Sequence, residues 1–350
     1  MKDIKNFRYL IFLSAVVSFF IGIRFLDIGK DTMEYIGHFE KFSINNIFGK
    51  FEIGFSILMY LFSNFIPSVE LFFVLISFIT TTIYLYFFKK IYIRNFPNDS
   101  FKFGKTLIFF SLLLLSSWYI TLTANGLRQG VALAILYHAL FELFFNNNKF
   151  KFLILYLVSC LFHYSVLLVA PFVLFYYLRF RLVFAIWIIT ALGYLYGINE
   201  LIVEAISTKF NLPVYDFIKY YSLPTETDKS RGGLYVGFNL GFFIYTVFFP
   251  LLLMVLLKVK LRLKNSTIVM RNVYNLLKIY FILSLQYFVF GFGPFSNRFA
   301  MLSWFLVPVL QFHLINTINF KNINEKLCLV INLITILYFL IFTLDWVRIF

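Results

Sequence analysis

The sequence predicts an all-α, polytopic membrane protein with about eleven transmembrane helices and one shorter interfacial or re-entrant helix. Three observations carry this prediction. The composition is 61% hydrophobic and only 13% charged, whereas soluble domains have about 25% charged residues. Apolar runs of about 17–25 residues, which match a bilayer core of roughly 30 Å, recur along the whole chain. The loops between these runs alternate between basic and acidic character.

The apolar runs can be assigned to spans in chain order. We expect the first run to be a retained span, because basic residues precede it but no small-residue cleavage site follows it. Residues 1–350 then form a single transmembrane domain whose two long outer loops, 26–68 and 199–235, lie over the functional site. The expected spans are 9–25, 69–88, 106–123, 127–145, 152–163, 164–178, 182–198, 236–257, 276–292, 299–316 and 327–345.

The charged residues predict the orientation of these spans. One set of alternate loops, together with the span ends beside them, holds about two thirds of the Lys and Arg residues but only about a quarter of the Asp and Glu residues. An excess of Lys and Arg marks the cytoplasmic side, so we expect the N-terminus inside and the C-terminus outside. The net charge of +15 therefore reflects topology and does not indicate nucleic acid binding.

Two apolar segments do not fit simple spans. Residues 53–66 are too few to cross a bilayer, so we expect an interfacial or re-entrant helix on the outer surface. Residues 152–178 are too many for one span and few for two. We expect two short helices there that meet at His163 below the outer surface, where irregular backbone is tolerated if it lines a polar cavity.

The sequence gives no support for metal or disulfide chemistry. Cys160 and Cys328 both fall inside apolar runs, which argues against a disulfide framework and against a thiolate metal site. The metalloprotease, nucleophile-elbow and phosphate-loop motifs are all absent from the sequence. We therefore expect no cofactor and no metal.

An arginine stands at the wrong end of a predicted helix. Asn125 and Gly126 mark a helix start, which places Arg128 in the first turn. A helix N-terminus already carries about half a positive charge, so a cation there costs about 0.3–1 kcal/mol unless an anion offsets it. We expect an anion beside Arg128.

Arg298 repeats this pattern. It follows Ser296 or Asn297, either of which can cap the start of the span at 299–316. Helix N-termini and guanidinium groups both bind phosphate oxygens well. A phosphate or pyrophosphate held by Arg128 and Arg298 at the outer boundary would explain both positions. The alternative is that each arginine reaches separately to the lipid headgroups.

Three residues are candidates for a general base, namely Asp31, Glu52 and His163. Asp31 and Tyr35 lie in the first outer loop at a spacing that suits one helical face. Glu52 adjoins the apolar segment 53–66, where partial desolvation is expected to raise its pKa toward a useful range. His163 sits at membrane depth, where ionisable residues are functional candidates. The alternative for His163 is a packed histidine bonded to a backbone carbonyl.

Several short motifs, in the same order along the chain, resemble the EpsG-like and Wzy-type bacterial surface-polysaccharide polymerases. The central one is an Arg-Gln helix start, a basic turn and then Phe-His-x-Ser ahead of an apolar run ending in proline. The matching positions are Asp31, Thr32, Tyr35, Glu52, Gly54, Arg128, Gln129, Ala132, Phe162, His163, Ser165, Pro171, Asn297 and Arg298.

The resemblance implies a glycosyltransferase of the bacterial cytoplasmic membrane that builds O-antigen or capsule. Such enzymes join oligosaccharide repeats carried on undecaprenyl pyrophosphate at the outer face. On this reading Arg128 and Arg298 bind the pyrophosphate, and Asp31, Glu52 or His163 is the base. The expected substrate-binding residues are Tyr35, Asn125, Gln129, Arg231 and Asn297, and Arg231 belongs to a loop that could close as a lid. Membrane lipids and a chain-length regulator protein are candidate partners.

Other functions are also compatible with these residues. A transporter or flippase for lipid-linked sugars also needs cations, but it should have a charged path through the bilayer. A ligase that moves finished polymer is chemically almost the same as a polymerase. An acyltransferase could use His163 as an intramembrane catalytic residue. A non-catalytic receptor would need no matched arginines.

Overall fold

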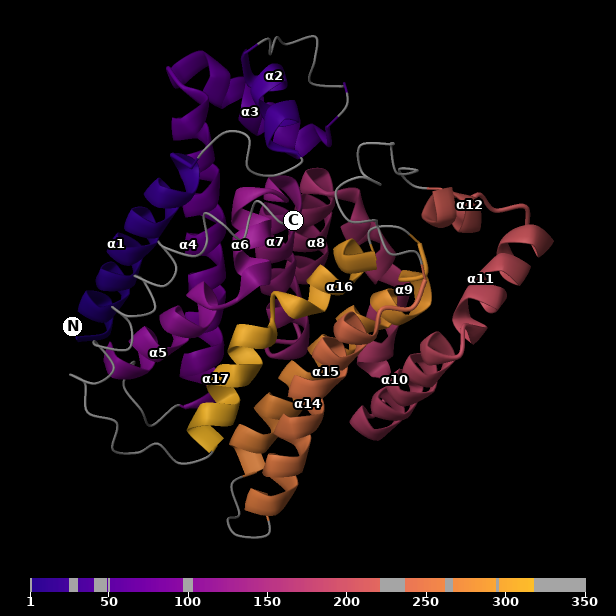
Figure 1. The fold of residues 1–350 in the computed structure, drawn as a ribbon. Helices are drawn as coiled ribbons and strands as arrows, with labels where there is room; N and C mark the ends of the chain where they lie inside the picture. The colour runs from indigo at the N-terminus through magenta and orange to yellow at the C-terminus, as the bar shows by residue number, and fades with distance from the viewer. Residues whose placement is uncertain are drawn as a thin grey trace. The chain divides into compact units, whose positions relative to one another are not determined.

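The regular elements of this computed structural model are all helices within the parts of the chain that it describes (Figure 1). Those parts are residues 2–24, 31–40, 49, 51–96, 103–220, 237–261, 267–293 and 296–317. The all-α prediction is confirmed for these residues. Five described helices are long and apolar enough to cross a membrane, or up to seven if each of two bent pairs is one span. The predicted count of eleven and the orientation are not confirmed, and the expected span 327–345 lies outside the described residues.

The five long spans agree in place with predicted ones. They are Val69–Asn95, Leu127–Phe144, Leu240–Leu257, Arg271–Phe290 and Ser296–Ile315.

The span predicted at 106–123 is broken into two helices. Helix α5 (Phe103–Leu114) ends early, and α6 (Ser117–Ala124) follows at an angle of 71°. The break lies at Ser116, whose hydroxyl accepts a hydrogen bond from the backbone N–H of Tyr119 at 3.4 Å. A serine that caps a new helix in this way competes with continuation of the old one.

A second bend lies at the end of the span predicted at 182–198. Helix α10 (Phe180–Leu195) meets α11 (Ile198–Lys209) at 92°, and Gly197 between them has a φ of +72°. A left-handed conformation is open to glycine at little cost, which explains how the chain turns so sharply. The predicted outer loop 199–235 therefore begins with two helices, α11 and α12 (Val214–Tyr220).

The chain divides into two compact units. The first consists of Met1–Leu167, Thr267–Asn272 and Gln311–Phe350. It contains α1 (Lys2–Gly22), α2 (Thr32–Glu40), α3 (Ile53–Phe65), α4 (Val69–Asn95), α5, α6, α7 (Leu127–Phe144) and α8 (Lys149–Phe162).

Helix α7 is the centre of the first unit. All of its residues are buried except Arg128 and Ile135. A side chain at Gly130 would come within 2.3 Å of the Leu122 carbonyl oxygen, so only glycine lets α6 approach. Ser159 of α8 donates to the Ala132 carbonyl of α7 at 2.6 Å. The small residues of α7 thus bring its neighbours close to its backbone.

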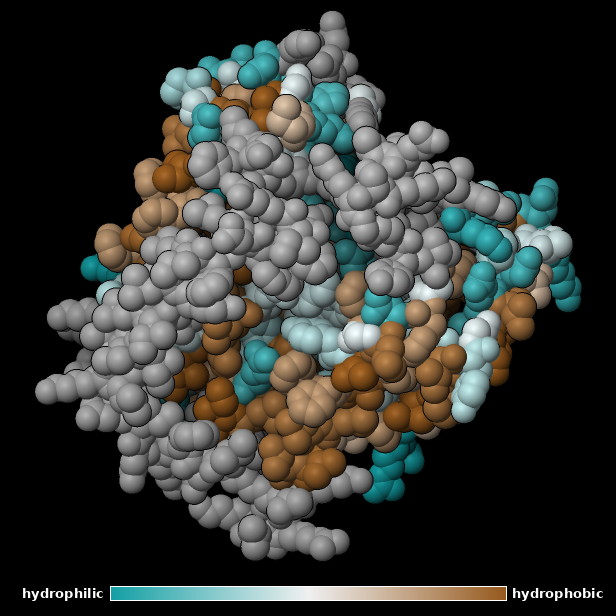
Figure 2. Space-filling view, viewed as in Figure 1, coloured by the Kyte–Doolittle hydropathy of each residue, from teal (hydrophilic) through white to brown (hydrophobic). Residues whose placement is uncertain are grey.

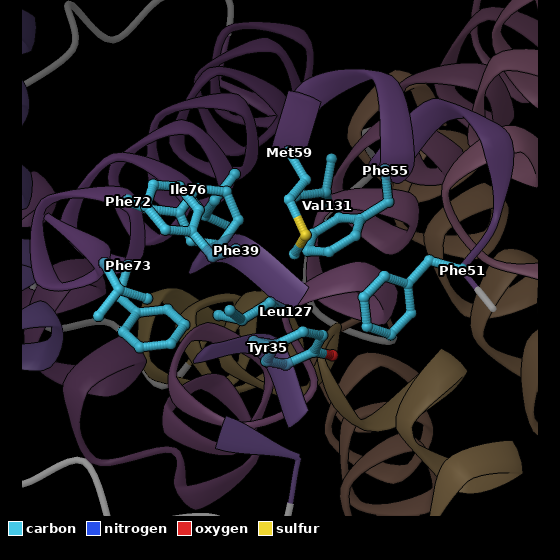
Figure 3. Packing of buried hydrophobic residues seen from close by; sticks show 11 residues of the cluster. Tyr35, Phe39, Phe51, Phe55, Met59, Phe72, Phe73, Ile76, Leu127 and Val131 are labelled. Atoms are coloured by element: carbon cyan, nitrogen blue, oxygen red, sulfur yellow. The ribbon is translucent and has the colours of Figure 1, made fainter. Parts of the chain in front are cut away.

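An apolar cluster fastens α2 and α3 to the first turns of α7 (Figure 3). Phe39 of α2 packs on Phe72 of α4 with ring centroids 5.0 Å apart. The predicted outer loop 26–68 is therefore partly built from packed helices. The buried members of the cluster are Tyr35, Phe39, Phe51, Phe55, Met59, Val69, Phe72, Phe73, Ile76, Leu127 and Val131.

The second unit consists of Leu168–Ser266 and Val273–Leu310. Its main helices are α10, α11, α12, α14 (Leu240–Leu261), most of α15 (Thr267–Phe290) and α16 (Ser296–Trp304). The indole N–H of Trp187 donates to Ser284 at 2.7 Å and joins α10 to α15, while Trp304 of α16 donates to Thr246 of α14 at 2.8 Å.

Helix α14 presents an apolar stripe at its surface, and Figure 2 shows brown, apolar surface over this part of the unit. The stripe consists of Leu240, Ile244, Phe248, Leu252 and Val255, all of them exposed. An apolar exposed face is what a lipid-facing helix requires.

The two short helices predicted to meet at His163 are confirmed in part. Helix α8 ends at Phe162, and His163 has extended backbone with φ −161° and ψ 122°. The segment that follows is a short α-helix, α9 (Ala170–Val173), between the 3-10 helices η2 (Tyr164–Val169) and η3 (Leu174–Tyr177), not one regular helix.

Candidate functional site

Arg128 lies in the first turn of α7, as the sequence predicts, and an anion does lie beside it. The anion is a carboxylate of the same chain. Nη1 of Arg128 donates to Oε2 of Glu52 at 2.6 Å. The guanidinium also lies over the ring of Phe51, 4.8 Å from its centroid, and Nε is 3.4 Å from the Tyr35 hydroxyl. The position of Arg128 is thus explained within the protein.

Glu52 is buried, with 4% of its surface exposed, and both of its carboxylate oxygens have partners. While Oε2 accepts from Arg128, Oε1 accepts from Nδ1 of His163 at 2.8 Å and from the backbone N–H of Tyr164 at 3.3 Å. Glu52 precedes α3 in extended conformation but its side chain does not cap that helix. The carboxylate is turned instead toward α7 and the end of α8. We call Arg128, Glu52 and His163 the Arg–Glu–His cluster.

The expectation that the pKa of Glu52 is raised toward a useful range is wrong. Burial by itself raises this pKa, but the hydrogen bond from His163 and the charges of His163 and Arg128 outweigh burial and lower the pKa from 4.5 to about 2. Opposite charges and hydrogen bonds to the charged form both favour ionisation. Glu52 is therefore a carboxylate at neutral pH.

The ionised Glu52 determines which nitrogen of His163 carries a proton. A carboxylate can only accept hydrogen bonds, so Nδ1 of His163 must donate. In the neutral imidazole the lone pair then lies on Nε2. Nδ1 of His163 faces Glu52, so this nitrogen does not bond to a backbone carbonyl.

Close packing brings Glu52 to His163. A side chain at Gly54 would lie 2.8 Å from the Leu161 carbonyl, so the glycine allows α3 to lie against the end of α8. Phe51, on the other side of Glu52, is buried in the apolar cluster. In Figure 3, Tyr35, Phe51 and Phe55 lie near Leu127, which is the first residue of α7. The Arg–Glu–His cluster is therefore positioned by helices that pack closely against one another.

The other predicted residues of the first unit lie near the start of α7. The side-chain oxygen of Asn125 accepts a hydrogen bond from the backbone N–H of Asp31 at 3.0 Å. Gln129 is buried next to Arg128 in α7. Asp31, Tyr35, Asn125 and Gln129 stay predictions as catalytic or substrate-binding residues.

Sequence reasoning missed Arg24, which is almost fully buried at this end of the unit. It donates to the carbonyl of Ala124, to that of Ile21 at 2.8 Å and to the hydroxyl of Thr32 at 3.1 Å. Arg24 thus joins the end of α1 to the start of α2 and the end of α6. An arginine at the end of the first apolar run was the available signal.

Arg298 and Asn297 lie in the first turn of α16, in the second unit. This confirms the helix position that the sequence predicts for Arg298. Ser296 and Asn297 are both helical, and residues 294–295 lie outside the described residues. The pairing of Arg298 with Arg128 stays a prediction. Arg231 lies outside the described residues.

No group of three or more His, Cys, Asp or Glu side chains in the described ranges could hold a metal ion. What the Arg–Glu–His cluster can do is proton transfer and anion binding. A carboxylate that accepts a hydrogen bond from one nitrogen of an imidazole orients the ring, and it stabilises the imidazolium that forms when the ring takes up a proton.

One comparison with known proteins gives a match. The family model described as the EpsG family matches residues 7–347, and no curated protein and no solved structure matches the chain.

Proposed function

The chain belongs to the EpsG family, and from that premise we propose that it is a polysaccharide polymerase of the bacterial cytoplasmic membrane. Its substrates would be oligosaccharide repeats linked to undecaprenyl pyrophosphate, and its product a longer lipid-linked glycan. The single observation that carries the chemical part of the proposal is the hydrogen bond between Glu52 and Nδ1 of His163, with Arg128 beside them.

In the proposed reaction, Nε2 of His163 removes the proton from a hydroxyl of the acceptor sugar. The hydroxyl oxygen attacks the anomeric carbon of the donor, and the bond from that carbon to the pyrophosphate oxygen breaks. The electron pair leaves with undecaprenyl pyrophosphate. Glu52 orients His163 and stabilises its positive charge, so we assign His163 as the base and Glu52 as its positioning residue.

Arg128 supports the leaving group in this proposal. Its Nη2 makes no hydrogen bond to the residues that the structure describes, so this edge of the guanidinium can meet a phosphate oxygen. With neutral His163 the cluster has no net charge. When His163 takes the proton, the cluster becomes positive at the moment when negative charge develops on the departing pyrophosphate. Charge stabilisation timed in this way favours the transition state over the ground state.

The test is the glycan ladder of a deletion strain that carries single variants of the gene. We expect Arg128→Ala and His163→Ala to leave only single exported repeats, while His38→Ala, a half-buried histidine outside the cluster, restores the ladder. For each variant we check that the protein is expressed and that it is monodisperse after solubilisation in detergent. A normal ladder from well-expressed Arg128→Ala and His163→Ala would overturn the proposal.

The same experiment separates the rival functions. Loss of exported repeats would indicate a flippase, and a normal ladder with an altered sugar would indicate an acyltransferase. Long polymer that stays on the lipid carrier would indicate a ligase.

A further inference from the structure

The second unit contains a small hollow, and none of the three residues of the Arg–Glu–His cluster lines it. Its volume is about 60 Å³, and it lies where α10 turns into α11 and where the chain enters α14. The lining residues are Tyr194, Gly197, Glu200, Gly237, Phe238 and Phe292. Figure 2 shows both hydrophilic and apolar surface on the neighbouring α11 and α12.

Backbone hydrogen bonds and two glycines build this hollow. Gly197 and Gly237 have φ values of +72° and +97°, and a side chain at either would meet no atom within 4 Å. The N–H of Gly237 donates to the Phe292 carbonyl at 2.8 Å, and the Tyr194 hydroxyl donates to the Gly291 carbonyl at 3.2 Å. These hydrogen bonds join the chain segments that line the hollow.

The lining combines an aromatic face with one carboxylate. Phe238 is 41% exposed, whereas Tyr194 and Phe292 are buried. The carboxylate of Glu200 is partly exposed. Its Oε1 accepts from the Tyr215 hydroxyl at 3.4 Å and lies 3.9 Å from Nζ of Lys219. Among the residues that the structure describes, none donates to Oε2 of Glu200. The hollow is thus lined by a strong hydrogen-bond acceptor, the carboxylate of Glu200, and by the exposed ring of Phe238.

The size and charge of the hollow select its ligand. A water molecule needs about 10–15 Å³ of such space, so the hollow has room for about four to six atoms of that size. One edge of a pyranose ring fits. Its C–H face can lie on Phe238, and a hydroxyl can donate to Glu200. A phosphate would be repelled by the carboxylate, and an acyl chain would leave the carboxylate without a donor.

We propose that this hollow is a binding subsite for one sugar unit of the glycan substrate. This inference rests on the proposed polymerase function. The hollow lies at the ends of three predicted spans, 182–198, 236–257 and 276–292, that are expected to face the outside. Glu200 and Phe238 are the residues that recognise the sugar, through the carboxylate oxygen and the exposed ring.

The test is saturation-transfer NMR on the full chain in lipid nanodiscs, with millimolar methyl glycosides of glucose, galactose, N-acetylglucosamine and rhamnose as probes. We expect saturation transfer from the protein to at least one probe. The transfer signal should be at least fivefold weaker in Glu200→Ala and in Phe238→Ala. Two matched controls keep the wild-type signal, namely Glu204→Ala, one turn along α11, and Tyr196→Ala, an exposed aromatic outside the hollow. Thermal unfolding confirms that each variant is folded.

Two results would overturn the subsite. One is no transfer to any probe. The other is transfer that is equal in the wild type and in folded Glu200→Ala and Phe238→Ala. Failure of the polymerase proposal looks different, because then Arg128→Ala and His163→Ala keep a normal glycan ladder, whatever the NMR result.

Discussion

Two buried carboxylates of the first unit meet opposite ends of helix α7, and their surroundings differ in one chemical respect. Glu52 is 4% exposed and contacts Arg128 in the first turn; Glu142 is 3% exposed and belongs to the last turn. Glu142 lies 3.1 Å from Nζ of Lys90 and 3.0 Å from Nζ of Lys151. Each carboxylate thus has two basic partners.

The difference lies in the partners. The lysines at Glu142 come from α4 and from the first turns of α8, so the carboxylate ties three helices together. Lysine holds its proton throughout the neutral range, and nothing in that group can exchange a proton with a substrate. At Glu52 one partner is a histidine, the side chain whose charge changes most readily near neutral pH. The two carboxylates have similar burial and charge, but their roles differ. The ion pairs of Glu142 join helices at one end of α7, whereas Glu52 and His163 can support acid–base chemistry at the other end.

The largest expected effect comes from Glu52→Gln. The amide keeps the shape of the carboxylate but can turn an N–H toward Nδ1 of His163, which would move the histidine proton to Nε2 and remove the base. We expect polymerisation to fall by about 10²–10⁴-fold. The initial rate of ladder formation by purified protein measures it.

Glu142→Gln is the matched control for that prediction. It should lower the rate by less than about tenfold, because no proton passes through this group. Equal losses in the two variants would contradict the assignment of different roles.

The next effect concerns stability. Glu52→Ala leaves the largely buried guanidinium of Arg128 without its anion, which costs about 3–5 kcal/mol. Glu142→Ala leaves lysines that can reach water, since the Lys151 side chain is 52% exposed, so we expect only about 1–2 kcal/mol. Denaturant unfolding in micelles measures both variants. A larger loss of unfolding free energy in Glu142→Ala than in Glu52→Ala would show that the ion pairs of Glu142 contribute more to the stability of the fold.

A smaller effect is expected with pH. The pKa of Glu52 is about 2 in the folded chain against an ordinary 4.5. A lowered pKa stabilises the folded state above the ordinary pKa, and this contribution is lost as pH falls through the folded value. The stability advantage of wild type over Glu52→Gln should therefore shrink by about 3 kcal/mol as pH falls from about 5 toward 2. Unfolding curves at stepped pH test this, and a loss centred near neutral pH would contradict it.

The smallest effect is expected for Lys151→Ala. This side chain is half exposed, and Glu142 keeps Lys90 and the amide of Asn146 at 2.8 Å. Exposed ion pairs contribute about 0–1 kcal/mol, so the unfolding free energy should change within that range and the polymerisation rate should stay unchanged. A rate that falls with Lys151→Ala would mean that this end of α7 also takes part in function.

The sequence alone determined the features that depend on neighbours along the chain. Hydropathy was enough for the helical membrane class, the Asn125–Gly126 start was enough to place Arg128 in a first turn, and the break at His163 followed from the length of an apolar run. It did not show the bends at Ser116 and Gly197, because an apolar run reads the same whether it is straight or broken.

Only the tertiary structure decided the candidate site. Glu52 lies 76 residues from Arg128 and 111 from His163, and no local pattern joins these positions. The sequence shows that Glu52 adjoins apolar residues, so it suggests a raised pKa; packing of α3 against α7 and α8 supplies the two basic groups that reverse the sign. The physical reason is that burial can be read from adjacent residues, whereas the charges that compensate burial come from helices far away in the chain.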